Sequence, residues 1–283
     1  MAGTRSFGVS THLYRTSRLS RGHLLEIGAH GFDAVELFAA RTHIDYHSPA
    51  AIADLRGWLG EAGLVLHSVH APVGEGFSAG RWLTPFTLAS TDRTLRAQAV
   101  AEAERALRIG RQIPFRVLVV HLGVPRWSPT AAADNSRDAA RQSIEELQAL
   151  AEPLGVRVAV EIYQNELSRP GSLVHFVERV IDASQVGICL DVGHAHLDGD
   201  LVDAIEVVSE HLIAVDVHDN QGRADDHLVP LEGSIEWPAA LTTLQKVGYD
   251  GPLMLELTPR GPTKETLARA RRARQRMEGW LAV

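Results

Sequence analysis

Side chains that can bind metal ions recur in this sequence at one kind of position. Seven short apolar segments each end, or nearly end, in a carboxylate or an imidazole, and these seven residues are Glu36, His70, His121, Glu161, Asp191, His218 and Glu256. Charged side chains are almost never buried without a partner. If the fold brings the seven together, a divalent metal ion is the simplest partner for so many of them.

Four of these residues would make a complete protein ligand set for one ion. Glu161, Asp191, His218 and Glu256 supply three carboxylates and one imidazole. A six-coordinate ion held in this way keeps two open positions, which a carbonyl and a hydroxyl oxygen on adjacent carbons of a sugar would fill. Ligands that are mostly oxygen with one nitrogen suit Mn²⁺, Mg²⁺ or Co²⁺, and Zn²⁺ also accepts them. We therefore expect a divalent ion as the cofactor.

The segment HDNQGRADDHLVP, which begins at His218, is unusually rich in such groups. Its first ten residues hold two histidines and three aspartates. Asp225 and His227 are therefore candidates for further metal ligands beside His218. The alternative interpretation is a polar loop that caps the end of the fold without binding an ion. His12, which follows the apolar segment FGVST, is a candidate substrate contact.

Strands must position these residues, because eight short apolar or β-branched runs alternate with longer amphipathic stretches. Such alternation predicts a parallel sheet, and eight pairs predict closure into a (β/α)8 TIM barrel of the α/β class. The 283 residues fit one such barrel, so we expect a single domain over residues 1–283. The predicted strands are 7–11, 34–38, 64–70, 116–123, 157–163, 186–193, 212–219 and 252–258.

A barrel also explains why the metal-capable side chains recur at strand ends. Active sites of this fold are built at the C-terminal ends of several strands at once. A doubly wound open sheet is the competing architecture, but it usually carries a glycine-rich loop after its first strand. The corresponding segment here, HLYRTSRLSRG, has no such pattern. Helical patterns between the strands begin with good caps, as in SPAAIADLRGWLGEAG, where Ser48 precedes Pro49.

Composition disfavours several other classes of protein. The net charge is −7, whereas a duplex-binding protein usually carries a basic stripe, so a nucleic-acid partner is not expected. No apolar run approaches the roughly 20 residues that span a bilayer, and the start, MAGTRSFGVS, lacks the apolar core of a signal peptide. The single cysteine, Cys189, excludes an internal disulfide and a cysteine-rich zinc site.

Because the sequence shows no signal peptide, no membrane span and no possible disulfide, we expect a cytoplasmic protein without a membrane partner.

The sequence resembles the xylose isomerase-like TIM barrel superfamily, in the branch shared by sugar phosphate isomerases/epimerases and AP endonucleases of family 2, the endonuclease IV type. Two motifs are specific when taken together, namely the segment from Asp191 to His194 and the segment from His218 to His227. In order along nearly the whole chain, the resemblance is carried by GFDAVELF, HAPVG, VVHLG, VEIYQN, LDVGHAHLDGD, VHDNQGRADDHLVPLEGSIEWPAAL and GYDGPLMLEL.

The resemblance implies two ligand sets. In the sugar branch one metal ion is held by the positions that match Glu161, Asp191, His218 and Glu256. In the endonuclease branch nine ligands bind three zinc ions. All nine matching positions hold the required residue type here, and they are His70, His121, Glu161, Asp191, His194, His218, Asp225, His227 and Glu256.

The resemblance also implies roles in catalysis. As in the tagatose epimerase-like members, Glu161 and Glu256 would remove and return a proton from opposite sides of the substrate while touching the metal. His194 would bind a substrate hydroxyl. Arg223 would bind the oxygen that becomes negative, although its spacing from His218 is one residue shorter than in those epimerases. The further expected substrate contacts are His12, His70 and His121.

These features predict a metal-dependent sugar or sugar-phosphate isomerase/epimerase that moves a proton next to a carbonyl through an enediolate. A small-molecule sugar is the expected partner, and the sugar-branch relatives often pair as homodimers. One alternative is an endonuclease IV-like zinc-dependent AP endonuclease, which the charge of −7 and the lack of a loop rich in Arg, Lys and aromatic residues disfavour. The other is a dehydratase of a cyclic polyol. The sequence does not distinguish this dehydratase from an isomerase/epimerase, because the substrate pocket is built by loops whose sequences do not reveal the substrate.

Overall fold

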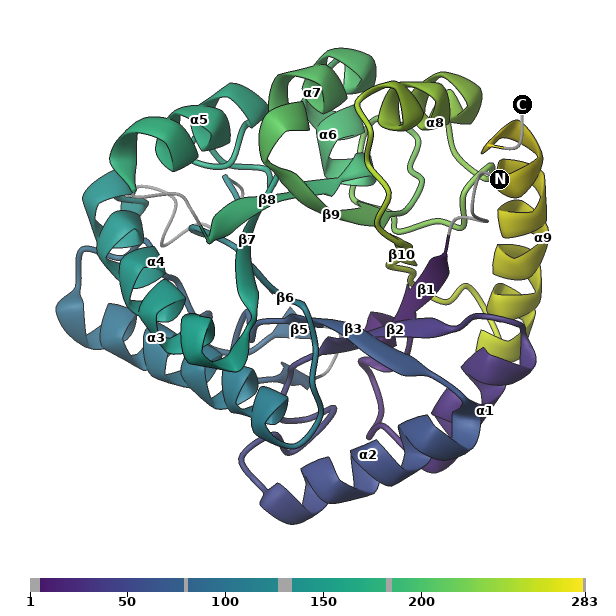
Figure 1. Cartoon of the computed structure of the whole chain (residues 1–283), viewed down its shortest axis with the longest axis horizontal. Coiled ribbons are helices and arrows are strands. Elements are labelled where there is room, and N and C mark those ends of the chain that lie inside the picture. Colours follow the sequence, from purple (N-terminus) through teal and green to yellow (C-terminus); the bar gives the residue numbers. More distant parts are fainter. Residues whose placement is uncertain (1–5, 79–80, 127–133, 182–184, 282–283) are drawn as a thin grey trace.

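The computed structural model describes residues 6–78, 81–126, 134–181 and 185–281. Eight parallel strands close into a barrel in the order β1-β10-β9-β8-β7-β6-β3-β2 (Figure 1). Pairing of β1 with β10 closes the ring, so the predicted TIM barrel is confirmed. The barrel strands are β1 (Phe7–Ser10), β2 (Ala34–Phe38), β3 (Val65–His70), β6 (Val117–Val120), β7 (Arg157–Glu161), β8 (Val186–Asp191), β9 (Leu212–Val217) and β10 (Leu253–Leu255).

Helices surround the barrel on its outside (Figure 1). The helix after β2 begins as predicted, because the Ser48 side chain accepts a hydrogen bond from Ala51 N and Pro49 occupies the first turn. It ends at Gly63, whose φ of 66° favours glycine. None of the helices in the described part of the chain is long and apolar enough to cross a membrane. The helices are α1 (Arg21–Ala29), α2 (Pro49–Ala62), α3 (Arg93–Leu107), α4 (Arg137–Ala151), α5 (Pro170–His175), α6 (Val192–Asp198), α7 (Leu201–Val208), α8 (Trp237–Lys246) and α9 (Thr263–Leu281).

The barrel has two apolar layers. Leu118 and Val120 of β6 are fully buried in the larger layer, between the strands and the helices. Because side chains alternate along a strand, Val117 and Val119 of the same strand point the other way, into the bore. The bore is filled by a smaller cluster that consists of Val117, Val119, Ala159, Cys189 and Ala214. A filled bore is typical of this fold and leaves ligand binding to the ends of the barrel.

Two carboxyl groups lie inside the bore. Glu36 of β2 is fully buried and accepts a hydrogen bond from Ser68 Oγ at 3.0 Å. Asp216 of β9 is 1% exposed and accepts one from Cys189 Sγ at 3.2 Å. Burial raises the pKa of both carboxyls, which favours their neutral forms. Glu36 does not line the pocket at the strand ends, so the expectation that all seven strand-end residues meet there is wrong for Glu36.

Several strands end earlier than the apolar pattern indicated. Three of them end immediately before the site residues His121, His218 and Glu256. β8 ends at Asp191, two residues earlier than predicted, because Asp191 is also the N-cap of α6 and accepts a hydrogen bond from the backbone N–H three residues on. Val192, the first residue of α6, is fully buried as well. The apolar pattern therefore runs on past the end of the strand.

A small hairpin in the long loop after β3 was not predicted from the sequence. Its strands, β4 (Phe77–Ser78) and β5 (Arg81–Trp82), pair in antiparallel fashion. Strands of two residues are too short for a recognisable alternation of apolar and polar side chains.

Candidate metal and substrate site

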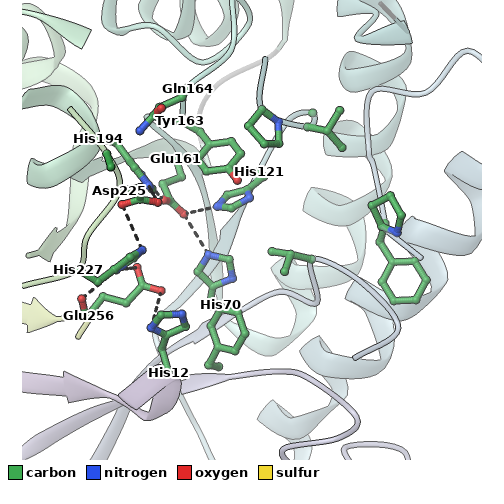
Figure 2. Close-up of a pocket in the computed structure, with 18 of the residues that line it drawn as sticks. His12, His70, His121, Glu161, Tyr163, Gln164, His194, Asp225, His227 and Glu256 are labelled. Carbon is green, nitrogen blue, oxygen red and sulfur yellow. Dashed lines mark hydrogen bonds and ion pairs between the residues drawn. The ribbon is translucent and has the colours of Figure 1, made fainter. Parts of the chain in front are cut away.

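A pocket of about 880 Å³ opens at the C-terminal ends of the barrel strands (Figure 2). Asp191 and His218 are fully buried beside it, in contact with His194 and Asp225, which face the pocket. The other predicted site residues all line the pocket, and they are His12, His70, His121, Glu161, His194, Arg223, Asp225, His227 and Glu256.

Glu161 ends β7 and contacts three histidines. Its Oε2 lies 3.1 Å from His70 Nε2 and 3.0 Å from His121 Nε2. Its Oε1 lies 3.2 Å from His194 Nδ1. Burial alone would raise the pKa of this fully buried carboxyl, but the three histidines hold the pKa well below its usual range. Glu161 is therefore ionised.

The histidines beside Glu161 differ in their own charge. His70 has an acceptor at each ring nitrogen, because Nδ1 lies 2.9 Å from Ala71 O and Nε2 lies 3.1 Å from Glu161 Oε2. Burial opposes the charge of His70, but Glu161 raises its pKa to about 10. Burial dominates at His121 and lowers its pKa, while Tyr163 stacks on its ring with centroids 3.9 Å apart. A neutral His121 can offer a ring nitrogen to a metal ion.

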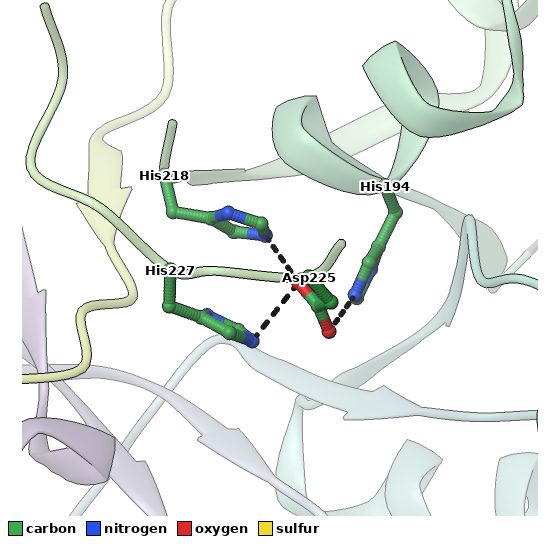
Figure 3. Close-up of side chains that lie close together, drawn as sticks. All are labelled: His194, His218, Asp225 and His227. Carbon is green, nitrogen blue, oxygen red and sulfur yellow. Dashed lines mark hydrogen bonds and ion pairs between the residues drawn. The ribbon is translucent and has the colours of Figure 1, made fainter. Parts of the chain in front are cut away.

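A second cluster surrounds Asp225, which lies in the loop after β9 (Figure 3). Its Oδ1 lies 3.5 Å from His218 Nε2 and 3.3 Å from His227 Nε2. Its Oδ2 lies 3.1 Å from His194 Nε2. Burial would raise the pKa of Asp225, but His194 and His227 hold it below its usual range. Since the other ring nitrogen of His194 faces Glu161, His194 joins the two clusters.

Glu256 directly follows β10 and has a different environment from Glu161. Its Oε1 lies 3.7 Å from His12 Nδ1, and its Oε2 lies 4.0 Å from His227 Nδ1. These contacts are longer than those of Glu161. Burial, opposed by His227, raises the pKa of Glu256 to about 7. Glu161 therefore stays ionised, whereas Glu256 gains or loses a proton near neutral pH.

The metal-capable atoms fall into four overlapping groups around the pocket, and within each group they lie within 4.8 Å of one another. The predicted set of Glu161, Asp191, His218 and Glu256 does not form one group, and its members are spread over all four. Shared members connect neighbouring groups, so the pocket has donors for more than one ion. The groups are His70–His121–Glu161, Glu161–Asp191–His194, His194–His218–Asp225–His227 and His12–His227–Glu256.

Unpartnered polar atoms in these groups fit a bound cation. Buried polar atoms in proteins nearly always have a hydrogen-bond partner. His218 Nε2 has none, although it lies 3.0 Å from Asp191 Oδ1. A divalent ion would satisfy such atoms, because imidazole nitrogens and carboxylate oxygens are its usual ligands. Among the described histidines and carboxylates in and beside the pocket, the buried atoms without a hydrogen bond are His121 Nε2, Glu161 Oε1, Asp191 Oδ2, His218 Nε2 and Asp225 Oδ1.

Asp219 holds the loop that carries Asp225 and His227. It is fully buried, and its Oδ1 accepts from Asn220 N at 2.9 Å and from Ile235 N at 3.2 Å. Its Oδ2 accepts hydrogen bonds from the backbone N–H of Leu231 at 2.9 Å and from the indole N–H of Trp237 at 2.8 Å. One of the three aspartates of the His218–His227 segment therefore has a structural role.

Several residues of the pocket were missed by the sequence analysis. Tyr163 and Gln164 line the pocket, and their only sequence signal was their place shortly after Glu161 in the VEIYQN motif. Phe38 and Phe86 form part of the apolar wall. Arg223 lines the mouth and makes no ion pair within the described residues.

Comparison with known proteins places the chain among sugar-enzyme relatives. Residues 24–281 match the family model described as xylose isomerase-like TIM barrel. An uncharacterized protein of Methanocaldococcus jannaschii is 30% identical over 261 residues, which cover 88% of this chain and 83% of that protein. L-ribulose-5-phosphate 3-epimerase UlaE of Salmonella paratyphi A is 27% identical over 254 residues, which cover 85% and 84%. The crystal structure of a D-tagatose 3-epimerase-like protein, 28% identical, covers 98% of this chain and 97% of its own with a TM-score of 0.78.

Proposed function

The chain belongs to the xylose isomerase-like TIM barrel family, and on that premise we propose that it is a metal-dependent sugar or sugar-phosphate isomerase/epimerase. The observation that carries the proposal is the pair Glu161 and Glu256, two buried carboxyls that face one pocket from separate strands and differ in charge. Carboxyls whose pKa values are driven apart are typical of acid/base pairs. The reaction would move a proton at a carbon next to a carbonyl.

The residues that would hold the ion are Glu161, Asp191, His218 and Glu256. Each of the first three has a buried polar atom without a hydrogen bond, which supports their part in this assignment. Mn²⁺, Mg²⁺, Co²⁺ and Zn²⁺ all suit these donors. A divalent ion at this place would polarise a substrate carbonyl and so make the neighbouring C–H more acidic. Further donors would bind a second or third ion, and they are His70, His121, His194, Asp225 and His227.

The side chains would divide the proton transfer between them. Glu161, held ionised by its histidines, is suited to accept the proton from carbon. Glu256, whose pKa is raised to about 7, is suited to return a proton. His194 and Arg223 would bind substrate oxygens, with His12, His70 and His121 as further contacts. The aromatic wall of Phe38 and Phe86 would exclude water from the reacting carbon.

The relatives support a sugar as substrate. The Salmonella relative is a 3-epimerase of L-ribulose 5-phosphate, and its match covers 85% of this chain. The solved structure of 28% identity is described as D-tagatose 3-epimerase-like. Both names describe a change at carbon 3 of a ketose, which is a carbon next to a carbonyl.

A screen of ketoses, aldoses and their phosphates in deuterated water tests the proposal. We expect one substrate to acquire deuterium at a single carbon next to its carbonyl, and we expect the exchange to stop when a chelator is added and to return with Mn²⁺. Proton NMR reads the exchange directly and also identifies the product epimer or isomer. Absence of exchange with every sugar in the metal-loaded protein would reject the function.

A second candidate is zinc-dependent cleavage at abasic sites in DNA, as in endonuclease IV. One observation favours it, because all nine residue positions that match that enzyme's ligands lie in or against the pocket. The net charge of −7 opposes it, since binding a duplex requires cations that displace counterions from phosphates. We expect no incision of an abasic duplex at physiological salt by zinc-loaded protein. A dehydratase of a cyclic polyol would use the same residues, and a product lighter than its substrate by one water would reveal it.

A further inference from the structure

Arg15 lies beside the pocket and was not identified from the sequence. It follows the helical turn η1 (Thr11–Tyr14), which directly continues β1. Its Nη1 donates a hydrogen bond to Thr258 Oγ1 at 3.0 Å, and its guanidinium lies over the ring of Phe77 at 5.2 Å from the centroid. The side chain is half-buried between the first strand, the last strand and the β4–β5 hairpin.

Arg15 has no carboxylate partner within the described residues, which is unusual for an arginine with this degree of burial. Of the four other half-buried arginines in that part of the chain, Arg141, Arg269 and Arg274 each pair with a glutamate. Arg96 donates to a carbonyl and to an amide oxygen. A guanidinium has five N–H donors, and Arg15 uses one of them on a neutral hydroxyl. Partial burial of a cation that has no directly paired anion costs free energy.

The neighbours of Arg15 show where it lies relative to the pocket. Thr258 lies two residues after Glu256, and its backbone N–H donates to His227 O at 2.9 Å. The negative charges of Glu256 and Asp225 act on Arg15, and the charge of Arg15 in turn lowers the pKa of His12. Arg15 therefore lies next to residues that line the pocket, although it is not itself one of the lining residues.

We infer that Arg15 binds an anionic group of the substrate, a phosphate or a carboxylate, on a carbon distant from the reacting carbonyl. The inference rests on the proposed function and adds the substrate class to it. A neutral sugar has hydroxyl oxygens that any polar rim could bind, whereas a phosphate or carboxylate supplies the missing charge and matches the planar fork of a guanidinium. Arg223, which also lines the mouth without an ion pair in the described chain, adds a second positive charge on the pocket.

The experiment compares matched neutral and anionic sugars in the full-length, metal-loaded protein. The pairs are L-ribulose with its 5-phosphate and D-fructose with its 6-phosphate, and a keto-hexuronate tests the carboxylate. Deuterium exchange gives kcat/KM for wild type, Arg15→Gln and Arg15→Lys. Arg18→Gln is the control, because Arg18 is an exposed cation in the same loop. Inorganic phosphate is tested as a competitive inhibitor of each variant.

We expect Arg15→Gln to lower kcat/KM for the anionic sugar about 10- to 100-fold, as for loss of a charged hydrogen bond, mainly through KM. The neutral partner should change less than twofold, Arg15→Lys should recover part of the loss, and inorganic phosphate should inhibit wild type more strongly than Arg15→Gln. A preference for the keto-hexuronate over the phosphates would identify the anion as a carboxylate. Arg18→Gln should match wild type throughout.

Two results would overturn the inference while leaving the proposed function in place. One is exchange with neutral sugars and not with their anionic partners. The other is an equal effect of Arg15→Gln on both members of a pair, which would make Arg15 a structural residue. If no sugar of any charge exchanges, the proposed function itself fails, and the inference fails with it.

Discussion

The two glutamates of the pocket differ in charge because their neighbours differ. Glu161 has three histidine nitrogens between 3.0 and 3.2 Å from its oxygens, and these hold its pKa low despite complete burial. Glu256 has its nearest histidine nitrogen at 3.7 Å, so burial prevails and its pKa rises to about 7. Two side chains of the same chemical type can therefore act as base and acid in one reaction.

Substitution of either glutamate should abolish turnover without unfolding the barrel. We expect Glu161→Gln and Glu256→Gln each to lower the rate of proton exchange by about 10²- to 10⁴-fold, because an amide cannot transfer the proton. Cooperative thermal unfolding should be retained. Glu166→Gln is the control, because the Glu166 side chain is 78% exposed in the loop after β7 and pairs with Arg169 at the surface. Near-normal exchange in either active-site variant would rule out the two-carboxyl mechanism.

The raised pKa of Glu256 should also appear in the stability of the metal-free protein. A carboxyl whose pKa is higher in the folded than in the unfolded state stabilises the fold below the unfolded pKa of about 4.5 and loses that contribution as the pH rises through about 7. Relative to wild type, chelator-treated Glu256→Gln should therefore gain on the order of 3 kcal/mol in free energy of unfolding between pH 4.5 and pH 8. Urea denaturation at both pH values measures this difference, and a difference that stays constant with pH would contradict the assigned environment.

At the scale of the elements, the turn from β8 into α6 fixes the position of His218. Asp191 ends the strand and caps the helix, so the chain reverses directly behind the pocket. Gly193 in the first turn of α6 packs against the imidazole of His218, and Asn220 Nδ2 donates to Gly193 O at 2.9 Å. A side chain at position 193 would overlap the histidine ring.

Gly193→Ala should therefore displace His218 and weaken metal binding. Because the collision is with a side chain, we expect the barrel to fold and the affinity for Mn²⁺ or Zn²⁺ to fall by at least about tenfold, as for disturbed orientation of a ligand. Isothermal titration of chelator-treated protein measures the affinity. Gly57→Ala is the control, since a Cβ at position 57 of α2 meets nothing within 4 Å and alanine favours the helix. Unchanged affinity in Gly193→Ala would show that His218 does not hold the ion.

The loop after β9 should depend on Asp219. Asp219→Ala removes the acceptor of four hydrogen bonds and leaves buried donors unpaired, so we expect a loss of about 3 kcal/mol or more in free energy of unfolding. Asp226→Ala is the matched control, because Asp226 pairs with Arg260 at the surface at 3.0 Å, and such a pair is worth less than about 1 kcal/mol. Urea denaturation at pH 7 compares the two. Equal effects would show that Asp219 does not anchor the loop.

The sequence predicted the elements better than the contacts between them. All eight barrel strands and the cap of α2 followed from local patterns, because apolar runs and helix caps are local properties. The roles of Asp219 and Arg15 could not be predicted, because their partners Trp237 and Thr258 lie 18 and 243 residues away. The same holds for Glu36, whose position near a strand end looked like that of the site residues although its side chain bonds to Ser68 in the bore.

At the scale of the whole molecule, closure of the barrel completes the site. Because β1 pairs with β10, His12 Nδ1 lies 3.3 Å from Leu257 O, which is 245 residues later in the sequence. The same closure brings Arg15 beside Thr258 and His12 beside Glu256. The pocket is therefore a property of the closed ring rather than of any strand–helix unit. The homodimer expected from the sequence stays a prediction.

Side chains from separate strands are proposed to hold a divalent ion between Glu161 and Glu256, and anomalous X-ray scattering from crystals grown with Mn²⁺ would locate that ion. We predict an anomalous peak in the pocket, about 2.0–2.3 Å from oxygen or nitrogen atoms of Glu161, Asp191, His218 and Glu256. A second peak would be expected only beside Asp225 and His227. An empty pocket in crystals that contain Mn²⁺, or a peak bound by none of these residues, would contradict the account.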